Sequence, residues 1–221
     1  MRPYLKKQNL SWLFVLAFLT SSLTFGQLKV EKWKLQVALG VNNPIDNDDP
    51  TFYSQYINFP SINLGVQRMF SRNWGAKLDL GYNRSSNGGG SVPFKLNYTR
   101  INAQAVYDFK DVFTFLPESI GVVGHAGPGV SITKPMVDNN ANINYNYANL
   151  SATYLNMLAG VEVHYRLSKT LSVFVDGSYA LALSSKNKSD VNSKGQFSFN
   201  GDLIYASIGV SISFDTCNYC P

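Results

Sequence analysis

Apolar and polar residues alternate along eight separate segments of this chain, and that pattern restricts the fold more than any other feature. In residues 33–42, every second residue from Trp33 to Val41 is apolar, and the residues between are small or polar. Successive side chains of a strand point to opposite faces, so each segment would form a strand with one apolar and one polar face. The other segments are 62–70, 74–82, 99–107, 120–132, 155–167, 171–181 and 204–214. The sequence therefore predicts an all-β protein.

Residues 1–26 have the pattern of a secretory signal peptide. They contain a basic start (Arg2, Lys6 and Lys7), an apolar run at 12–19 that is too short to span a bilayer as a helix, and small residues at 24–26. We predict that the exported chain starts at Gln27; a retained membrane anchor is the alternative. Removal of this segment lowers the Lys and Arg count from 19 to 16 against 14 Asp and Glu, which argues against a nucleic-acid partner.

The connections between the segments alternate between short and long. Short or moderate connections lie at 71–73, 109–118 and 168–170, and long polar ones lie at 43–60, 84–95, 133–154 and 182–202. In bacterial outer-membrane barrels, short turns face the periplasm and long loops face the exterior. The sequence thus predicts an eight-stranded antiparallel up-and-down transmembrane β-barrel over residues 27–214. Both termini would be periplasmic, with residues 215–221 as a short periplasmic tail.

Aromatic residues on the apolar face agree with this topology. Trp33, Phe70, Trp74, Tyr107, Tyr165 and Phe214 all fall near strand ends assigned to the periplasm, whereas Tyr82 and Tyr179 fall toward the other end. Such positions predict the aromatic girdles that flank the apolar band of a membrane barrel. A soluble periplasmic barrel that binds an apolar ligand would need the apolar face inside, and the richness of the polar face in Gly, Ser and Asn disfavours it.

The last segment resembles a known assembly signal. Residues 207–214 place a polar residue, a glycine, a hydrophobic residue and an aromatic residue at Ser207, Gly209, Ile212 and Phe214. With this ending, residues 30–214 resemble the eight-stranded barrel family typified by outer membrane protein A. The resemblance implies that these four residues are read by the barrel-assembly machinery. Many members continue into a peptidoglycan-binding domain; this sequence ends at Pro221, so peptidoglycan anchoring is not carried over.

The polar face of the strands would line the barrel lumen. Its charged members are expected to form a network: Lys34, Lys77, Asp79, Arg100, Glu162, His164, Arg166 and Asp176, beside the inward Asn102, Gln104 and His125. The interior of an eight-stranded barrel is just wide enough for its own side chains, and buried charges of mixed sign can pair. We therefore expect a plugged lumen. A gated channel and a buried catalytic site are the alternatives.

Residues with catalytic or metal-binding chemistry are few. The chain has two histidines, and Glu162, His164 and Ser172 could approach one another, but no nucleophile motif surrounds them. Cys217 and Cys220 form a single C-x-x-C without a second ligand pair, so a disulfide is the default expectation in an exported protein. We expect no enzyme activity, no cofactor and no metal site.

The expected role is structural or interactive. Outer-membrane lipid and the assembly machinery would be the partners, and an extracellular ligand could contact the four long loops, including the aromatic, Asn-rich stretch 139–154. A small porin is the alternative function, and an enzyme acting in the lumen is a further one.

Overall fold

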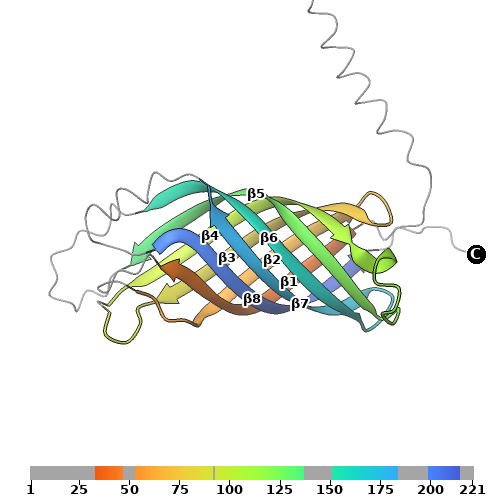
Figure 1. Cartoon of the computed structure of the whole chain (residues 1–221), viewed down its shortest axis with the longest axis horizontal. Helices are drawn as coiled ribbons and strands as arrows, with labels where there is room; N and C mark the ends of the chain where they lie inside the picture. Colours follow the sequence, from red (N-terminus) through yellow and green to blue (C-terminus); the bar gives the residue numbers. More distant parts are fainter. Residues whose placement is uncertain (1–32, 47–52, 92, 137–150, 184–198, 215–221) are drawn as a thin grey trace, which may run out of the picture.

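Eight strands close into a barrel in chain order, and each strand is antiparallel to its neighbours (Figure 1). The computed structural model describes residues 33–46, 53–91, 93–136, 151–183 and 199–214. The strands are β1 (Trp33–Asp46), β2 (Asn58–Met69), β3 (Trp74–Ser86), β4 (Lys95–Asp108), β5 (Ile120–Met136), β6 (Ala152–Arg166), β7 (Leu171–Ala182) and β8 (Phe199–Phe214). The predicted fold class is confirmed. The predicted signal peptide and the tail with Cys217 and Cys220 lie outside the described residues.

The alternating pattern decides which face of each strand is buried. In β2, the apolar Ile62, Leu64 and Val66 are exposed on the outer wall, while Asn63 and Gln67, which belong to the alternate positions, are buried in the lumen. This arrangement reverses that of a soluble protein, and it suits a barrel whose outer wall meets lipid. No helix in the part of the chain that the structure describes is long and apolar enough to cross a membrane.

Most strands extend beyond the segments predicted from the alternation, and they do so toward the long loops. The β3–β4 pairing continues past Tyr82 as far as the pair Ser86 and Lys95. The inward residues there, such as Asn83, are still buried, but the outward residues Arg84 and Ser86 are polar, so the strand continues while the apolar–polar alternation ends. The alternation marks the apolar belt and not the strand ends, so the long loops are shorter than predicted.

The first residue of β1 and the last residue of β8 lie at the end of the barrel where the short turns are, at the right of Figure 1. Trp33 at the start of β1 pairs with Phe214 at the end of β8. The tight turns after β2 and β6 lie at this end, as does the 3₁₀ turn η1 (Phe109–Asp111) after β4. At the opposite end, an isolated bridge between Ser54 and Asn87 joins the β1–β2 and β3–β4 connections.

The lumen holds an apolar layer as well as a polar one. Toward the long loops, buried inward residues form a cluster: Tyr98, Tyr154, Leu158, Ala180, Leu203 and Tyr205. The rings of Tyr98 and Tyr154 meet edge to face, with centroids 6.5 Å apart. The alternation predicted a lumen lined by polar side chains throughout, and the structure shows that only part of the lumen is polar. Side chains that meet across the lumen can exclude water from one another, so apolar residues can also be buried there.

Candidate functional site

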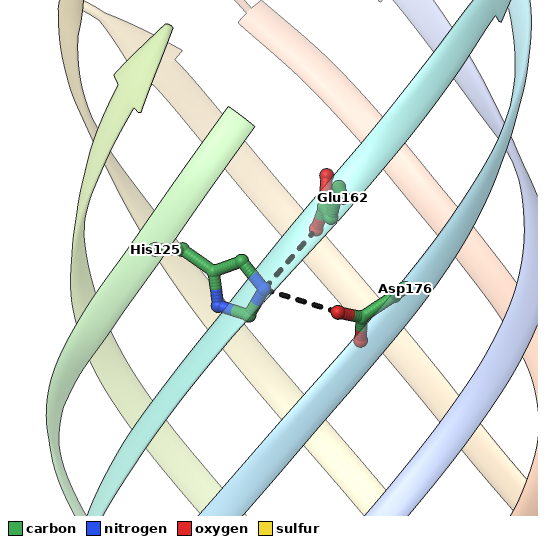
Figure 2. A group of neighbouring side chains, drawn as sticks. All are labelled: His125, Glu162 and Asp176. Atoms are coloured by element: carbon green, nitrogen blue, oxygen red, sulfur yellow. Dashed lines mark hydrogen bonds and ion pairs between the residues drawn. The ribbon is translucent and has the colours of Figure 1, made fainter. Parts of the chain in front are cut away.

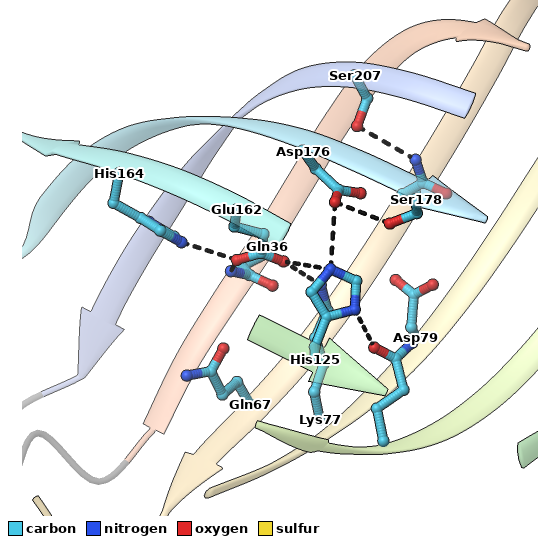
Figure 3. A network of polar contacts seen from close by, with 12 residues as sticks. Gln36, Gln67, Lys77, Asp79, His125, Glu162, His164, Asp176, Ser178 and Ser207 are labelled. Atoms are coloured by element: carbon cyan, nitrogen blue, oxygen red, sulfur yellow. Dashed lines mark hydrogen bonds and ion pairs between the residues drawn. The ribbon is translucent and has the colours of Figure 1, made fainter. Parts of the chain in front are cut away.

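A buried group of charged side chains crosses the lumen next to this apolar layer. We call it the charge layer, and it consists of Lys77, Asp79, Arg100, His125, Glu162 and Asp176. Five consecutive strands supply these residues through the inward positions of their alternating pattern: β3 gives two, and β4, β5, β6 and β7 give one each. Figure 3 shows part of this network.

Lys77 and Glu162 form the shortest ion pair of the charge layer. Lys77 Nζ lies 2.5 Å from Glu162 Oε1, and both side chains are buried. The other carboxylate oxygen, Oε2, accepts a hydrogen bond from Gln36 Nε2 at 2.9 Å and lies 2.7 Å from His164 Nε2. Side chains of β1, β3 and β6 thus meet at one carboxylate (Figure 3). Gln36 was not among the residues expected in the lumen network.

Arg100 spans the lumen at the boundary of the charged and apolar layers. Its guanidinium lies 3.2 Å from Asp79 Oδ2 and donates a hydrogen bond to Asn63 Oδ1 at 2.7 Å. The same group stacks over the ring of Tyr205, 4.4 Å from its centroid. β4 and β8 are not neighbours, so this cation–π contact joins separated parts of the wall.

His125 lies between two carboxylates of the charge layer. Its Nε2 lies 3.1 Å from Asp176 Oδ1 and 3.9 Å from Glu162 Oε1 (Figure 2). Its Nδ1 lies 2.6 Å from Gln104 Oε1. Asp176 Oδ1 also accepts a hydrogen bond from Ser178 Oγ at 2.8 Å. The sequence prediction placed Arg166 in the same network, but in the structure Arg166 does not belong to the charge layer.

Arg166 and Lys34 lie at the rim of the barrel and not in the buried layer. Arg166 is the last residue of β6, and its side chain is exposed. Both residues line a hollow at the short-turn end, the rim hollow, together with Glu118, His164, Ser172 and Ser213. The alternation reports which face a residue occupies but not its depth, which is why Arg166 was placed with the network.

Comparisons with known proteins support the fold. Protein-family models and curated protein sequences give no match. Among solved structures, a major outer membrane protein from Thermus thermophilus is similar with a TM-score of 0.57 and 14% identity, over 83% of this chain and 98% of that one. Neisserial surface protein A is similar with a TM-score of 0.52 and 16% identity, over 82% and 97%. Ail, the attachment invasion locus protein of Yersinia pestis, is similar with a TM-score of 0.50 and 11% identity, over 84% and 100%.

This chain has the fold of an eight-stranded outer-membrane β-barrel. The resemblance noted from the sequence holds for the architecture, and at these identities the similarity extends to the fold alone. The lumen contacts of this barrel therefore have to be interpreted from its own residues.

The predicted aromatic residues lie on the outer wall of this barrel. Trp33, Phe70, Trp74, Tyr165 and Phe214 are exposed, and Tyr107 is half-buried. Trp74 and Tyr107 meet edge to face with centroids 4.8 Å apart, and Phe109 of η1 continues the group, 4.9 Å from Tyr107. All lie near the short-turn end of the barrel, and their role as an interfacial girdle stays a prediction.

The four residues of the resembled assembly signal divide between the two faces of β8. Ser207 is buried in the lumen, and Ile212 and Phe214 are exposed on the outer wall. Gly209 lies where a Cβ atom would come within 2.7 Å of the Phe174 ring. Close packing inside the barrel therefore also requires a glycine at this position.

The candidate hydrolytic residues are only partly brought together. His164 contacts Glu162 and stacks on Phe174, with centroids 5.1 Å apart. Ser172 lines the same rim hollow as His164, but within the described residues no hydrogen bond joins the two. A nucleophile needs its base within hydrogen-bond reach, so these residues do not form an assembled triad in this conformation.

Proposed function

We propose that this protein resides in the outer membrane as a surface-interacting scaffold whose lumen is closed by the charge layer. The long loops would be extracellular and both termini periplasmic. Exposed apolar side chains on the outer wall support the location, among them Leu78 at 58% exposed and Val175 at 55% exposed. Such side chains would be unfavourable in water, whereas a bilayer solvates them.

The observation that supports closure is the set of contacts between strands that are not neighbours. Lys77 of β3 reaches Glu162 of β6, and Asn102 of β4 donates a hydrogen bond to Asn156 of β6, 2.5 Å away. Gln36 of β1 reaches Glu162 as well. Side chains that touch across the lumen occupy the space that a permeating solute would need. A lumen of this girth has little room beyond its own side chains.

Conductance of the purified barrel in planar bilayers tests this closure. We expect little or no steady conductance from the unaltered protein. Arg100→Ala should raise the frequency of brief openings, because it removes the side chain that joins Asp79 to Tyr205 and leaves a buried carboxylate without its cation. Arg166→Ala is the matched control, since that side chain is exposed at the rim, and it should leave the recordings unchanged. Large, steady conductance from the unaltered protein would instead identify a small porin.

Exposed apolar residues at the long-loop end support an interaction role. Tyr56 is 89% exposed, Ile57 is 70% exposed and Phe59 is 64% exposed, all just before or within the start of β2. The neighbouring residue Tyr53 is held by a hydrogen bond from its hydroxyl to Gly89 O in the β3–β4 connection. We propose that this apolar group contacts an extracellular ligand, together with the connections at 43–60, 84–95, 133–154 and 182–202.

Binding to arrays of immobilised glycans and matrix proteins tests the surface role. The barrel in nanodiscs should bind at least one class, and the triple variant Tyr56→Ser, Ile57→Ser and Phe59→Ser should lose that binding while it remains folded. Absence of binding by the unaltered protein would overturn the interaction role and leave the scaffold role. We propose no enzymatic role, since the rim residues Ser172 and His164 are not joined.

A further inference from the structure

Three side chains of the charge layer direct electron-pair donors toward one point. His125 Nε2 of β5, a carboxylate oxygen of Glu162 of β6 and one of Asp176 of β7 all lie within 4.8 Å of one another (Figure 2). All three side chains are buried. We propose that His125, Glu162 and Asp176 bind a divalent metal ion of the zinc class inside the lumen. This inference goes beyond the proposed closure and holds whether or not the lumen conducts.

The spacing of the three atoms fits a small metal ion. His125 Nε2 lies 3.1 Å from Asp176 Oδ1 and 3.9 Å from Glu162 Oε1. An ion with tetrahedral ligands at about 2.0–2.2 Å holds its ligand atoms roughly 3.4 Å apart. The two distances lie on either side of that value, and binding would draw the two carboxylate oxygens, which lie within 4.8 Å of each other, together around the ion. Imidazole nitrogen and carboxylate oxygen are both ligands that zinc takes in proteins.

The hydrogen bond at the other ring nitrogen orients His125 for this role. Nδ1 lies 2.6 Å from Gln104 Oε1, an amide oxygen that can only accept, so Nδ1 carries the hydrogen. In the neutral ring, Nε2 then presents its lone pair to Asp176 and Glu162. Metal-bound histidines commonly donate their second N–H to a carbonyl or carboxylate in this way. A lone pair facing two carboxylates is repulsive unless a cation lies between them.

The balance of buried charge points in the same direction. Within the charge layer, Asp79, Glu162 and Asp176 are acidic, whereas Lys77 and Arg100 are the permanent cations. With His125 neutral, the layer has one more negative than positive charge, so it needs a further cation. Uncompensated charge in a low-dielectric interior is costly. A divalent ion would supply that cation, and a proton on His125 is the competing occupant.

Lys77 would compete with the metal ion, and this competition gives a test of the proposal. Its ammonium lies 2.5 Å from Glu162 Oε1, the same oxygen that faces His125. The lysine and the metal ion would therefore compete for one carboxylate oxygen. Removal of the ammonium by Lys77→Met should tighten metal binding, whereas a purely structural defect would weaken it. The rim hollow lies beside this site, because His164 lines that hollow and contacts Glu162.

The experiment uses the mature chain, refolded in detergent and freed of metal by a chelator. Zn²⁺ binding is measured by calorimetry, and Co²⁺ is added as a spectroscopic probe. Cys217 and Cys220 could themselves bind Zn²⁺ through thiolates, so every variant is compared in a Cys217→Ser and Cys220→Ser background. In that background a lumen site keeps its Co²⁺ absorption without a thiolate charge-transfer band.

Two glycines provide a matched pair of variants in which no proposed ligand residue is itself substituted. A Cβ at Gly160 would overlap Ser178 Oγ and would lie 2.6 Å from His125 Cε1 and 2.7 Å from Nε2. Gly160→Ala should therefore push both the imidazole and the Ser178 hydroxyl, which donates to Asp176, out of their present positions. A Cβ at Gly177, on the neighbouring strand, would meet nothing within 4 Å, so Gly177→Ala is the control.

We expect one equivalent of Zn²⁺ to bind in the cysteine-free background. Asp176→Asn and Gly160→Ala should weaken binding at least tenfold, Gly177→Ala should leave it unchanged, and Lys77→Met should tighten it. The proposal is overturned if no metal binds in that background, which would assign the central position to a proton on His125. It is equally overturned if Asp176→Asn binds as tightly as the parent.

Discussion

Lys77 and Glu162 form an ion pair at 2.5 Å although β4 and β5 separate their strands in the barrel wall. The pair therefore crosses the lumen and does not reinforce a ladder between neighbouring strands. Both side chains are buried, so solvent screens their interaction little. Glu162 also accepts from Gln36 of β1. One carboxylate thereby joins three strands that backbone hydrogen bonds do not pair with one another.

Loss of the cation in this pair should destabilise the barrel. Lys77→Met leaves Glu162 buried without its main counter-charge, and removal of one partner of a buried pair costs about 3–5 kcal/mol. Urea unfolding of the metal-free protein in lipid vesicles measures the change. The double variant Lys77→Met and Glu162→Gln should recover much of the loss, because no charge is then left unpaired. An unaltered midpoint for the single variant would show that Glu162 is compensated by its other neighbours.

The outer wall should reject a charge at mid-depth. Leu78 lies between Trp74 and Tyr82 on β3 and is 58% exposed, so Leu78→Arg would place a guanidinium among lipid chains. The expected loss is about 2–4 kcal/mol, whereas Leu167→Arg near the membrane interface should cost only about 0–1 kcal/mol. Both values come from the same unfolding experiment. Equal losses for the two variants would refute the assigned depths.

Gly81 should tolerate no side chain. A Cβ there would overlap the guanidinium of Arg100, which is fully buried and cannot move aside. We expect Gly81→Ala to cost about 1–3 kcal/mol, as overpacking does, and to loosen the contact of Arg100 with Tyr205. Gly177→Ala, where the added methyl meets open space, serves as the comparison. The same cost for both would trace the effect to the backbone and not to Arg100.

The orientation of the barrel can be measured on intact cells. In a Cys217→Ser and Cys220→Ser background, Gly89→Cys places a thiol in the exposed β3–β4 connection, and Lys169→Cys places one in the exposed β6–β7 turn at the opposite end. An impermeant maleimide should label the first and not the second, because long loops face the exterior and short turns the periplasm. The reverse pattern would invert the proposed topology.

The alternation in the sequence was sufficient to predict the strands and their facing. A period of two assigns every residue of β3 to lipid or lumen, since a shift by one residue would expose each polar side chain to the membrane. Lys77 and Leu78 could therefore be placed on opposite faces without a structure. The alternation of apolar and polar residues stops at the edge of the apolar belt. The strand ends at Ser86 and Lys95 lie beyond that edge, so they could not be predicted from the sequence.

The partners inside the lumen were decided by the tertiary structure alone. Asp176 contacts His125 and not Arg166, because strand register and barrel shear fix the height at which each side chain enters the lumen. The same stagger brings Glu162 to Lys77 across two intervening strands. Local sequence specifies the face of a strand through its short repeat, whereas depth and contact across the lumen depend on closure of all eight strands at once.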